Sequence, residues 1–483
     1  MKTLIKFPYK RLVIVAFRLP FKFIRKKDGI VASQNSGGLV SAVLSLSSKL
    51  IPVQNNPDNS KIVWIGEGKE INGKIINENA IPKNFELSPV NIPARINDQY
   101  YGGFCNDTIW PLFHYFPSLV TYDEKYFDAY LHANKLFYEQ LKKVIQPGDF
   151  IWVHDYQLFL VPDMVRRDFP ELPIGFFLHI PFPSYEIFRL MPKTWHNMIL
   201  KGMLGADIVG FQTTDYARYF IRSVQKSLGL KIRRNLITIE NRSVKATAFP
   251  IGIDFEKFNS ACLTAAVKRE KRKIKRNVRN MKLIFSVDRL DYTKGLVNRL
   301  RGIEYFLETY PEWNERVIFN LVVVPSRDTI ERYKKMKKEI EATVGRINGK
   351  YSNISWRPII YQYKSLSFSE LVALYDVCNT GLITPLRDGM NLVSKEYIAC
   401  QVENKGFLIL SEMAGASAEL KDAILINPFD YREMAEAIKM SLEMPVDEIE
   451  RRLIRMQKRV QSYTVFKWAS DIFKEAAQLR MSV

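Results

Sequence analysis

Residues 287–296 read VDRLDYTKGL, and they join the end of an apolar run, LIFSVD, to the start of an amphipathic stretch, GLVNRLRGIEYFL. This pattern predicts a buried strand, a short loop and a helix. Arg289 and Lys294 fall on the loop, at the carboxyl end of the strand, where open α/β sheets bind their ligands. Two fixed cations beside the start of a helix suit a diphosphate, because the N–H groups there add further donors. We therefore expect this loop to bind a diphosphate.

Apolar runs bounded by Gly, Pro, Asn or Asp alternate with helix-period stretches through most of the chain. In the first half the predicted strands are RLVIVAFRLP, KIVWIGEG, FIWVHDYQ, IGFFLHIPF, ADIVGFQT and VKATAFPIGI. In the second half they are LIFSVDRLD, IFNLVVVPS, ISWRPIIY, TGLITPL, FLILSE and AILINP. Stretches such as SELVALYDV lie between them, with apolar residues at helical spacing. The alternation predicts an α/β fold with parallel sheets and crossover helices.

The length of 483 residues predicts two domains, because a single core stops growing at roughly 250–300 residues. A predicted strand ends in FPIGID, residues 249–254, and a basic helix follows this Pro and Gly punctuation. We place the boundary there. The expected parts are an N-terminal domain at 1–250, a C-terminal domain at 251–465, and a last helix at 466–483 that packs back toward the N-terminal domain. Ligand is expected in a deep cleft between the two domains.

The N-terminal run LVIVAF follows basic residues and superficially suits a signal peptide. It is short, however, Arg18 follows at once, and no small-residue cleavage site is present. We interpret it as a buried strand. No apolar run in the sequence approaches the roughly 18–20 residues that span a bilayer. These features predict a cytoplasmic protein with no membrane partner.

Metal and disulfide chemistry have little support in the residue pattern. The four cysteines are widely spaced, and the five histidines show neither HxxxH nor HExxH spacing. No D-x-D pair is present, so the commonest way to present a divalent metal to a nucleotide-sugar diphosphate is missing. We therefore expect no metal site and no cofactor, with the diphosphate neutralised by Arg, Lys and helix ends.

The net charge of +20 raises nucleic acid as an alternative partner. The densest basic run is KREKRKIKRNVRNMK, residues 268–282. Val267, Ile274 and Val278 fall roughly on one face of it, so we interpret it as a solvated helix packed by that face. Nothing in the chain resembles a zinc finger, an RNA-recognition motif or a basic zipper. No nucleic-acid partner is expected.

Nine segments together resemble the trehalose-6-phosphate synthase family of retaining glycosyltransferases, in this order along nearly the whole chain. They are FRLPF with NSGGLVSAVLSL, YYGGFCNDTIWPLFHYF, WVHDYQLFLVPDMVR, IGFFLHIPFPSYEIFRLMP, FPIGIDFEKF, FSVDRLDYTKGL, VVPSRD and TPLRDGMNLVSKEYIACQ. The resemblance implies the GT-B architecture, in which two Rossmann-like domains face each other. It also implies that the 287–296 loop binds the leaving group of a nucleotide sugar.

Residue by residue, the resemblance implies a donor site on the C-terminal domain and an acceptor site on the N-terminal domain. Arg289, Lys294, His179 and Asp388 are the implied catalytic residues. The implied donor-binding residues are these four together with Gly37, Gly38, Gly389, Met390, Asn391, Leu392 and Glu396. The implied acceptor-binding residues, which hold glucose 6-phosphate, are Arg18, Tyr101, Trp110, Asp155 and Arg327.

Several residues keep a second interpretation. Asp155 also fits a helix N-cap, Trp110 also fits the core, and Arg18 also fits a pair with a buried acid. The choice of Tyr101 over Tyr100 depends on the family alignment alone. The chain departs from the family at Ala16-Phe17, where Ser-Asn is usual, and at Glu67, where many members carry a second tryptophan. Glu67 lies on the acceptor side and therefore leaves the acceptor open.

The implied activity is transfer of glucose from a nucleoside-diphosphate-glucose to glucose 6-phosphate, which forms α,α-trehalose 6-phosphate with retained configuration. UDP-glucose is the favoured donor, and ADP- and GDP-glucose stay open. The alternatives are another sugar- or polyol-phosphate acceptor, or a catalytically silent regulatory homologue. No phosphatase domain is recognised, so a separate trehalose-phosphate phosphatase is expected, and a homo-oligomer stays open.

Overall fold

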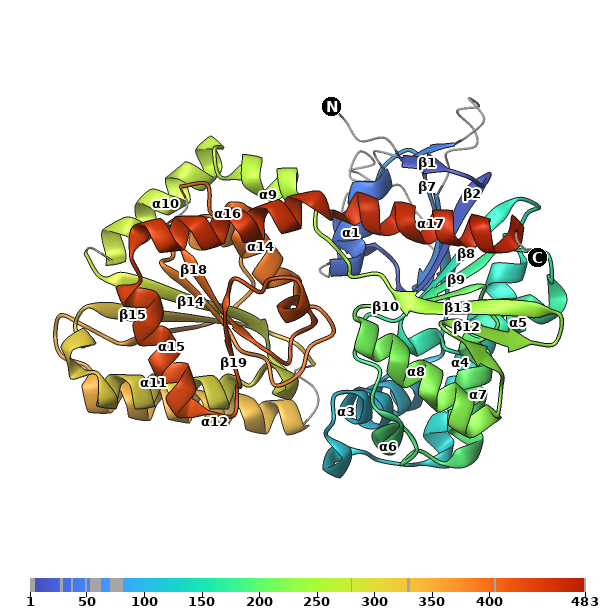
Figure 1. The fold of residues 1–483 in the computed structure, drawn as a ribbon, viewed down its shortest axis with the longest axis horizontal. Coiled ribbons are helices and arrows are strands. Elements are labelled where there is room, and N and C mark those ends of the chain that lie inside the picture. Colours follow the sequence, from blue (N-terminus) through green and yellow to red (C-terminus); the bar gives the residue numbers. More distant parts are fainter. Residues whose placement is uncertain are drawn as a thin grey trace. The chain divides into compact units, whose positions relative to one another are not determined.

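The computed structural model describes residues 5–26, 29–35, 38–47, 50–52, 62–69, 81–278, 280–327, 331–403 and 405–481. They form two compact units (Figure 1). Unit 1 is Met1–Ile251 with Val465–Val483, and unit 2 is Gly252–Thr464. Each unit is an α/β layer structure built on a mainly or wholly parallel sheet. The predicted α/β fold with two Rossmann-like domains is therefore confirmed.

The sheet of unit 1 has nine strands among the described residues, in the order β11-β12-β13-β10-β9-β8-β2-β6-β7. The strands from β13 to β7 are parallel, and β11 and β12 extend the edge in antiparallel fashion. Their bounds are β2 Arg11–Arg18, β6 Ile62–Glu67, β7 Phe85–Val90, β8 Asp149–His154, β9 Ile174–Phe177, β10 Ile208–Phe211, β11 Ile232–Arg233, β12 Leu236–Ile239 and β13 Arg242–Ala248. Two further pairs are β1 Ile5–Phe7 with β5 Leu50–Pro52, and the hairpin of β3 Phe21–Lys26 with β4 Gly29–Gln34.

Helices cover both faces of this sheet. Central strands such as β8 are therefore buried along their whole length. Helices α4, α5, α7 and α8 pack one against the next, and α17 packs on β9 and β10 (Figure 1). The bounds are α1 Gly38–Ser47, α2 Ala94–Asn97, α3 Trp110–Phe113, α4 Glu124–Lys142, α5 Val161–Asp168, α6 Tyr185–Phe188, α7 Lys193–Met203, α8 Thr214–Leu228 and α17 Val465–Met481. Between α2 and α3, residues Asp98–Ile109 form a π-helix.

The sheet of unit 2 has six parallel strands among the described residues, in the order β16-β15-β14-β17-β18-β19. The order reverses between β14 and β17, which makes their carboxyl ends a topological switch point, the usual ligand position in such sheets. The bounds are β14 Lys282–Arg289, β15 Val317–Val324, β16 Ile359–Tyr363, β17 Thr380–Ile383, β18 Phe407–Ser411 and β19 Ile424–Ile426.

The helices of unit 2 form two layers, one on each face of the sheet (Figure 1). One layer holds α11 Leu296–Thr309, α12 Glu331–Tyr351 and α15 Tyr431–Glu443. The other holds α9 Phe255–Ala261, α10 Ala265–Val278, α13 Phe368–Val377, α14 Leu392–Cys400 and α16 Val446–Ser462. The basic run forms α10, as predicted: Val267 and Val278 are buried, Ile274 is half-buried, and the basic side chains between them are mostly exposed.

Each strand predicted from the sequence is present, including β2 from the N-terminal apolar run. The strands that sequence reasoning missed are short or polar, such as β7, whose FELSPV sequence contains a proline. A proline is tolerated there because β7 is an edge strand. Within the described residues, no helix combines the length and the apolar character that a bilayer crossing requires.

Candidate functional site

The turn from β14 to α11 carries the two cations that the sequence singled out. Arg289 ends β14, is exposed, and makes no hydrogen bond or ion pair with the described residues. Lys294 lies in a short 3-10 turn, and Gly295, at φ 62°, begins α11. A Cβ at Gly295 would lie 3.0 Å from the carbonyl oxygen of Thr384. Glycine is therefore required both for this left-handed backbone and for the close approach of the next loop.

The loop from β17 to α14 is bound to this turn by an ion pair and by backbone hydrogen bonds. Lys294 Nζ lies 2.5 Å from Asp388 Oδ2, and both side chains are largely buried. The N–H groups of Leu386 and Arg387 both donate to the carbonyl of Thr293, at 2.8 and 3.3 Å. Two sequence motifs separated by 94 residues thus meet at the switch point between β14 and β17.

Arg299 on α11 is hydrogen-bonded to residues on both sides of this junction. Sequence reasoning did not single it out. Its fully buried guanidinium donates to Asp288 Oδ2 at 2.7 Å, to Thr384 Oγ1 at 2.8 Å, to Ser286 Oγ and to the carbonyl of Lys294 at 3.2 Å. Such a charge is tolerated in the interior because every contact satisfies a donor. A signal was available, because Arg299 falls on the apolar face of α11 with Leu296, Leu300 and Ile303.

The turn 388–391 is a compact backbone cradle in front of α14. Asn391, at φ 77°, caps the helix through Oδ1, which accepts from the N–H of Ser394 at 3.0 Å, and its Nδ2 donates to Asp388 at 3.1 Å. A Cβ at Gly415 would lie 2.0 Å from the carbonyl oxygen of Gly389, so the neighbouring loop closes tightly on the turn. Met390 is buried and Leu392 begins the helix. The start of a helix behind such a turn favours anionic ligands.

Glu396 lies one turn into α14 and is half-buried. Its carboxylate accepts a hydrogen bond of 3.2 Å from the hydroxyl of Tyr375 on α13. Burial raises the pKa of Glu396 to about 7, while Tyr375 and Lys257 oppose that rise. A carboxyl group held this way is suited to accept hydrogen bonds from ligand hydroxyls.

Arg327 follows β15 in unit 2 with a left-handed backbone, φ 55°. Its guanidinium donates to Asp291 Oδ2 at 2.9 Å and also contacts the hydroxyl of Tyr333. Asp291 is buried and accepts from the N–H and hydroxyl of Thr293 as well. Of the predicted acceptor residues, Arg327 is the one that lies in unit 2, where it forms an ion pair with Asp291 of the β14–α11 turn.

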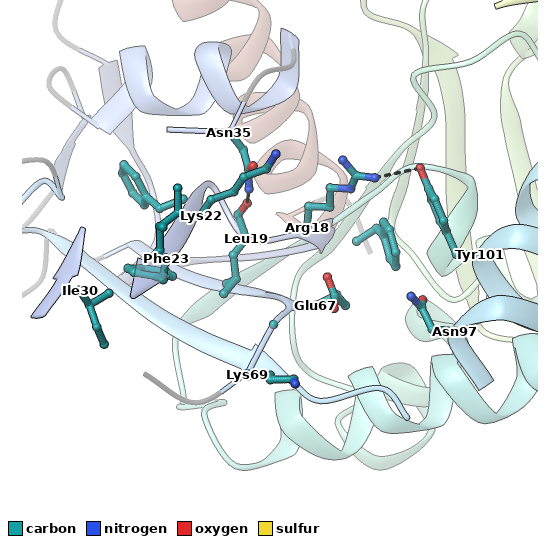
Figure 2. Close-up of a pocket in the computed structure, with 14 residues that line it drawn as sticks. Arg18, Leu19, Lys22, Phe23, Ile30, Asn35, Glu67, Lys69, Asn97 and Tyr101 are labelled. Carbon is teal, nitrogen blue, oxygen red and sulfur yellow. Dashed lines mark hydrogen bonds between the residues drawn. The ribbon is translucent and has the colours of Figure 1, made fainter. Parts of the chain in front are cut away.

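Arg18 and Tyr101 meet in unit 1 at the edge of a pocket of about 630 Å³ (Figure 2). Arg18 Nη2 donates to the Tyr101 hydroxyl at 3.2 Å, and Phe17 stacks on the Tyr101 ring with centroids 4.4 Å apart. The register of β2 against β6 shifts between Val15 and Arg18, and such irregularities re-aim side chains. Arg18 is exposed and makes no ion pair within the described part of the chain, so its alternative role in a buried pair is wrong. Tyr100, by contrast, is buried and donates to the carbonyl of Gln157.

Glu67 lies beside Arg18 in the same pocket, because the two are register partners on β6 and β2. Burial raises the pKa of the Glu67 carboxyl, and the Arg18 charge opposes that rise. Glu67 makes no hydrogen bond or ion pair with any described residue. Figure 2 shows it below Arg18 with Asn97, whose buried Oδ1 also has no partner among the described residues. The pocket therefore presents the Glu67 carboxyl group and the Arg18 cation side by side.

His179 and Asp155 lie together at the carboxyl ends of β8 and β9. Asp155 Oδ1 accepts from the backbone N–H of His179 at 3.2 Å, and Asp155 has a strained backbone at φ 73°. Its side chain makes no cap bond to the short helix that follows, so the N-cap interpretation is wrong. His179 Nε2 lies 3.1 Å from His154 Nδ1. Burial lowers the pKa of His179 to about 3, so its imidazole is neutral near pH 7.

The remaining predicted residues are Trp110, Gly37 and Gly38. Trp110 on α3 is 6% exposed, with its ring 4.1 Å from that of His114 and 5.8 Å from that of Tyr156. Gly38 is exposed at the start of α1, and Gly37 lies outside the described residues. Among the residues described, no group of three or more His, Cys, Asp or Glu side chains is arranged to hold a metal.

This chain is similar to known proteins along nearly its whole length. The family model described as Glycosyltransferase family 20 matches residues 10–478. The UDP-forming alpha,alpha-trehalose-phosphate synthase A of Dictyostelium discoideum is 40% identical over 467 residues, which are 96% of this chain but 62% of that protein. The UDP-forming alpha,alpha-trehalose-phosphate synthase of Schizosaccharomyces pombe is 40% identical over 476 residues, 98% of this chain and 91% of that protein.

A solved structure is similar over the same range. The UDP-forming alpha,alpha-trehalose-phosphate synthase of Burkholderia xenovorans, in complex with glucose-6-phosphate, is 32% identical with a TM-score of 0.86. The match covers 97% of this chain and 100% of that one. Since the family model and these relatives span nearly all of its residues, this chain belongs to glycosyltransferase family 20.

Proposed function

We propose that this protein is a retaining glucosyltransferase that moves glucose from UDP-glucose to glucose 6-phosphate and forms α,α-trehalose 6-phosphate and UDP. The observation that carries the proposal is the junction of Lys294 with Asp388, which joins a cationic turn to a helix-capping turn at the switch point of unit 2. The names of the similar proteins, which are UDP-forming, support the donor base and the acceptor.

In this proposal the donor binds to unit 2. Arg289 and Lys294 neutralise the diphosphate, and the 389–392 backbone presents N–H groups to it. Asp388 accepts a hydrogen bond from a hydroxyl of the transferred glucose, and Glu396 accepts hydrogen bonds from the ribose hydroxyls. Burial raises the pKa of Glu396, and ribose hydroxyls that donate to its carboxylate would stabilise the charged form and oppose that rise. His179, Gly37 and Gly38 are further donor-binding residues in this proposal.

A second set of residues is proposed for the acceptor. Arg18, Tyr101 and Arg327 bind the phosphate of glucose 6-phosphate, where each charged hydrogen bond contributes roughly 1.5–3 kcal/mol. Asp155 takes sugar hydroxyls and Trp110 flanks the ring. The exposed guanidinium of Arg18, already oriented by Tyr101, supports this assignment. Binding energy from the phosphate then orients the reacting hydroxyl at a distance.

The chemistry proposed is front-face departure and attack, in which the leaving phosphate accepts the acceptor's proton. No side chain then has to be a strong base, which agrees with the low pKa of His179. Catalysis is electrostatic: Arg289 and Lys294 stabilise the charge that develops on the leaving diphosphate. We include metal independence in the proposal, because these cations and the helix ends supply the neutralisation.

The proposal also covers the setting of the enzyme. The product leaves phosphorylated, so a separate phosphatase completes the conversion. A cytoplasmic location is supported by four buried cysteines that form no disulfide among the described residues, since cytosolic thiols stay reduced.

The test is release of nucleoside diphosphate from UDP-, ADP- and GDP-glucose, each with and without glucose 6-phosphate. The proposal expects release that depends on both UDP-glucose and glucose 6-phosphate. Release in no combination would favour a silent regulatory homologue, which the intact cationic turn opposes.

A second candidate function changes only the acceptor, and Glu67 motivates it. An unpartnered carboxyl next to Arg18 lowers the positive charge that a phosphate meets, and it offers an acceptor to an additional hydroxyl. Parallel assays with glucose 6-phosphate, fructose 6-phosphate and glycerol 3-phosphate decide between the two candidates. If a phosphate other than glucose 6-phosphate gives the highest kcat/KM, the second candidate replaces the first.

A further inference from the structure

His154, which no sequence motif assigned to the site, ends β8 directly beside the strand that leads to His179. The two strands are parallel neighbours, with His154 paired to Phe177, two residues before His179. The ring nitrogens His154 Nδ1 and His179 Nε2 are 3.1 Å apart. His154 is fully buried against Trp152 and Trp468, and His179 is partly exposed.

Neither ring carries a charge near pH 7. Burial lowers the pKa of both imidazoles, to about 3 for His179 and well below the ordinary value for His154. Among the described residues, Asp155 is the charged group that is hydrogen-bonded to His179, and it accepts from the backbone N–H of His179. A single proton therefore lies between the two rings, and it belongs either to His154 Nδ1 or to His179 Nε2.

The far side of His154 distinguishes these two arrangements. His154 Nε2 is buried and has no hydrogen-bond partner among the described residues. If His179 donated, His154 Nε2 would carry its proton as an orphaned N–H in an aromatic pocket, the rarer and costlier kind of unsatisfied group. If His154 donates from Nδ1, its Nε2 carries only a lone pair, and no buried N–H is stranded.

We infer that His154 is a positioning residue that donates from Nδ1 to His179 Nε2, and thereby fixes His179 as the tautomer with its proton on Nδ1. His179 Nδ1 makes no hydrogen bond with the described residues, so this N–H is free for a ligand. Resting on the proposed function, the consequence is that His179 donates a hydrogen bond to a hydroxyl oxygen of the donor sugar. It cannot act there as a proton acceptor.

The first test reads the tautomer directly and needs no substrate. Histidine labelled with ¹⁵N gives a long-range proton–nitrogen spectrum of five histidines, with His154 and His179 assigned from the His154→Asn and His179→Gln spectra. We expect His179 to show a protonated-type shift at Nδ1 and an unprotonated-type shift at Nε2, from pH 6 to 8. A protonated-type shift at His179 Nε2, or an imidazolium, overturns the inference.

The second test compares two replacements at His154. Asparagine places an N–H donor close to where Nδ1 was, and phenylalanine fills the space without one. We expect His154→Phe to lower kcat/KM for the nucleotide sugar at least tenfold with little change in KM for glucose 6-phosphate, and His154→Asn to recover most of the loss. Equal losses in two variants of equal melting temperature overturn the inference. If the wild-type protein releases no nucleotide, the proposed function fails while the spectrum still decides the tautomer.

Discussion

Lys294 has two partners in the proposed reaction, the Asp388 carboxylate that it contacts now and the diphosphate that it would neutralise. The contact with Asp388 holds the ammonium group in place before any ligand arrives. Preorganisation of this kind is what makes fixed charge effective in catalysis, because no reorganisation is needed when charge develops. Arg289 differs, since its exposed guanidinium has no partner within the described residues.

Replacing either cation should therefore lower turnover far more than it lowers the stability of the fold. Arg289→Ala and Lys294→Ala are each expected to lower kcat by about 10²–10³-fold, as for other groups that stabilise a developing charge. Arg289→Ala should change the free energy of unfolding by less than about 0.5 kcal/mol. Lys294→Ala should cost roughly 1–3 kcal/mol, because Asp388 loses its cation but keeps Asn391. Steady-state kinetics measures the change in kcat, and thermal melting measures the change in stability.

Lys282→Ala is the matched control, since Lys282 is exposed at the opposite end of the same strand. It should leave both the rate and the melting temperature unchanged. Wild-type turnover in a folded Arg289→Ala or Lys294→Ala protein would contradict the assignment of these cations.

Glu396 gives a second residue-scale prediction, on pH. Because burial raises its pKa from 4.5 to about 7, the folded state binds the proton more tightly than the unfolded state. Below pH 4.5 both states are protonated; as pH rises through 7 the folded state loses up to about 3 kcal/mol relative to the unfolded state. Glu396→Gln avoids that loss, so its melting temperature should exceed that of the wild type by several degrees at pH 8 and by little at pH 4.5.

Glu450→Gln, at an exposed glutamate on α16, is the control and should show no such pH-dependent gain. A Glu396→Gln protein with the same melting difference from wild type at both pH values would show that burial does not perturb this carboxyl group.

At the scale of elements, the proposed donor site depends on how closely the β14–α11 turn approaches the loop after β17. The approach is possible because residue 295 has no side chain and adopts φ 62°. Arg299 then bonds to both segments from inside the helix. The cationic turn is therefore positioned by packing between elements as well as by its own sequence.

Gly295→Ala tests this dependence. Its Cβ would lie 2.9 Å from Leu386 Cδ2 and 3.0 Å from the Thr384 oxygen, in a backbone region that alanine disfavours. We expect a loss of roughly 1–3 kcal/mol in stability, with a fall in kcat because Lys294 shifts. Gly345→Ala on α12 is the control, since nothing lies near its added Cβ; it should stabilise by about 0.5–1 kcal/mol, as expected for alanine over glycine inside a helix. Equal stability of the two variants would contradict the close approach.

The predictability of these elements from sequence follows from what each one requires. The buried strands and the β14 turn could be predicted, because a run such as LIFSVD and the cations after it lie close together in the chain. Arg299 could have been noticed as a charge on an apolar helix face, but its partners, like those of Tyr375 and His154, lie on other elements and could not be predicted. Asp388 could be placed at the site only through family resemblance, since its partner Lys294 is 94 residues away.

At the scale of the whole molecule, two Rossmann-like units each present candidate functional groups at the carboxyl ends of parallel strands. In unit 2 these groups follow β14 and β17, and in unit 1 they follow β2, β8 and β9. Parallel strands place such groups at one edge of a sheet because all their carboxyl ends meet there. The fold alone supports many activities, so the proposed activity depends on the particular side chains at these edges.

The most direct measurement follows UDP release with the purified full chain, UDP-glucose and glucose 6-phosphate, in excess EDTA, beside the Lys294→Ala protein. The account predicts UDP release that requires both substrates, persists in EDTA, yields a phosphorylated non-reducing disaccharide, and falls at least a hundredfold in the variant. Release abolished by EDTA, or an equal rate in the variant, would contradict the claim that a cationic turn in unit 2 stabilises the departing diphosphate.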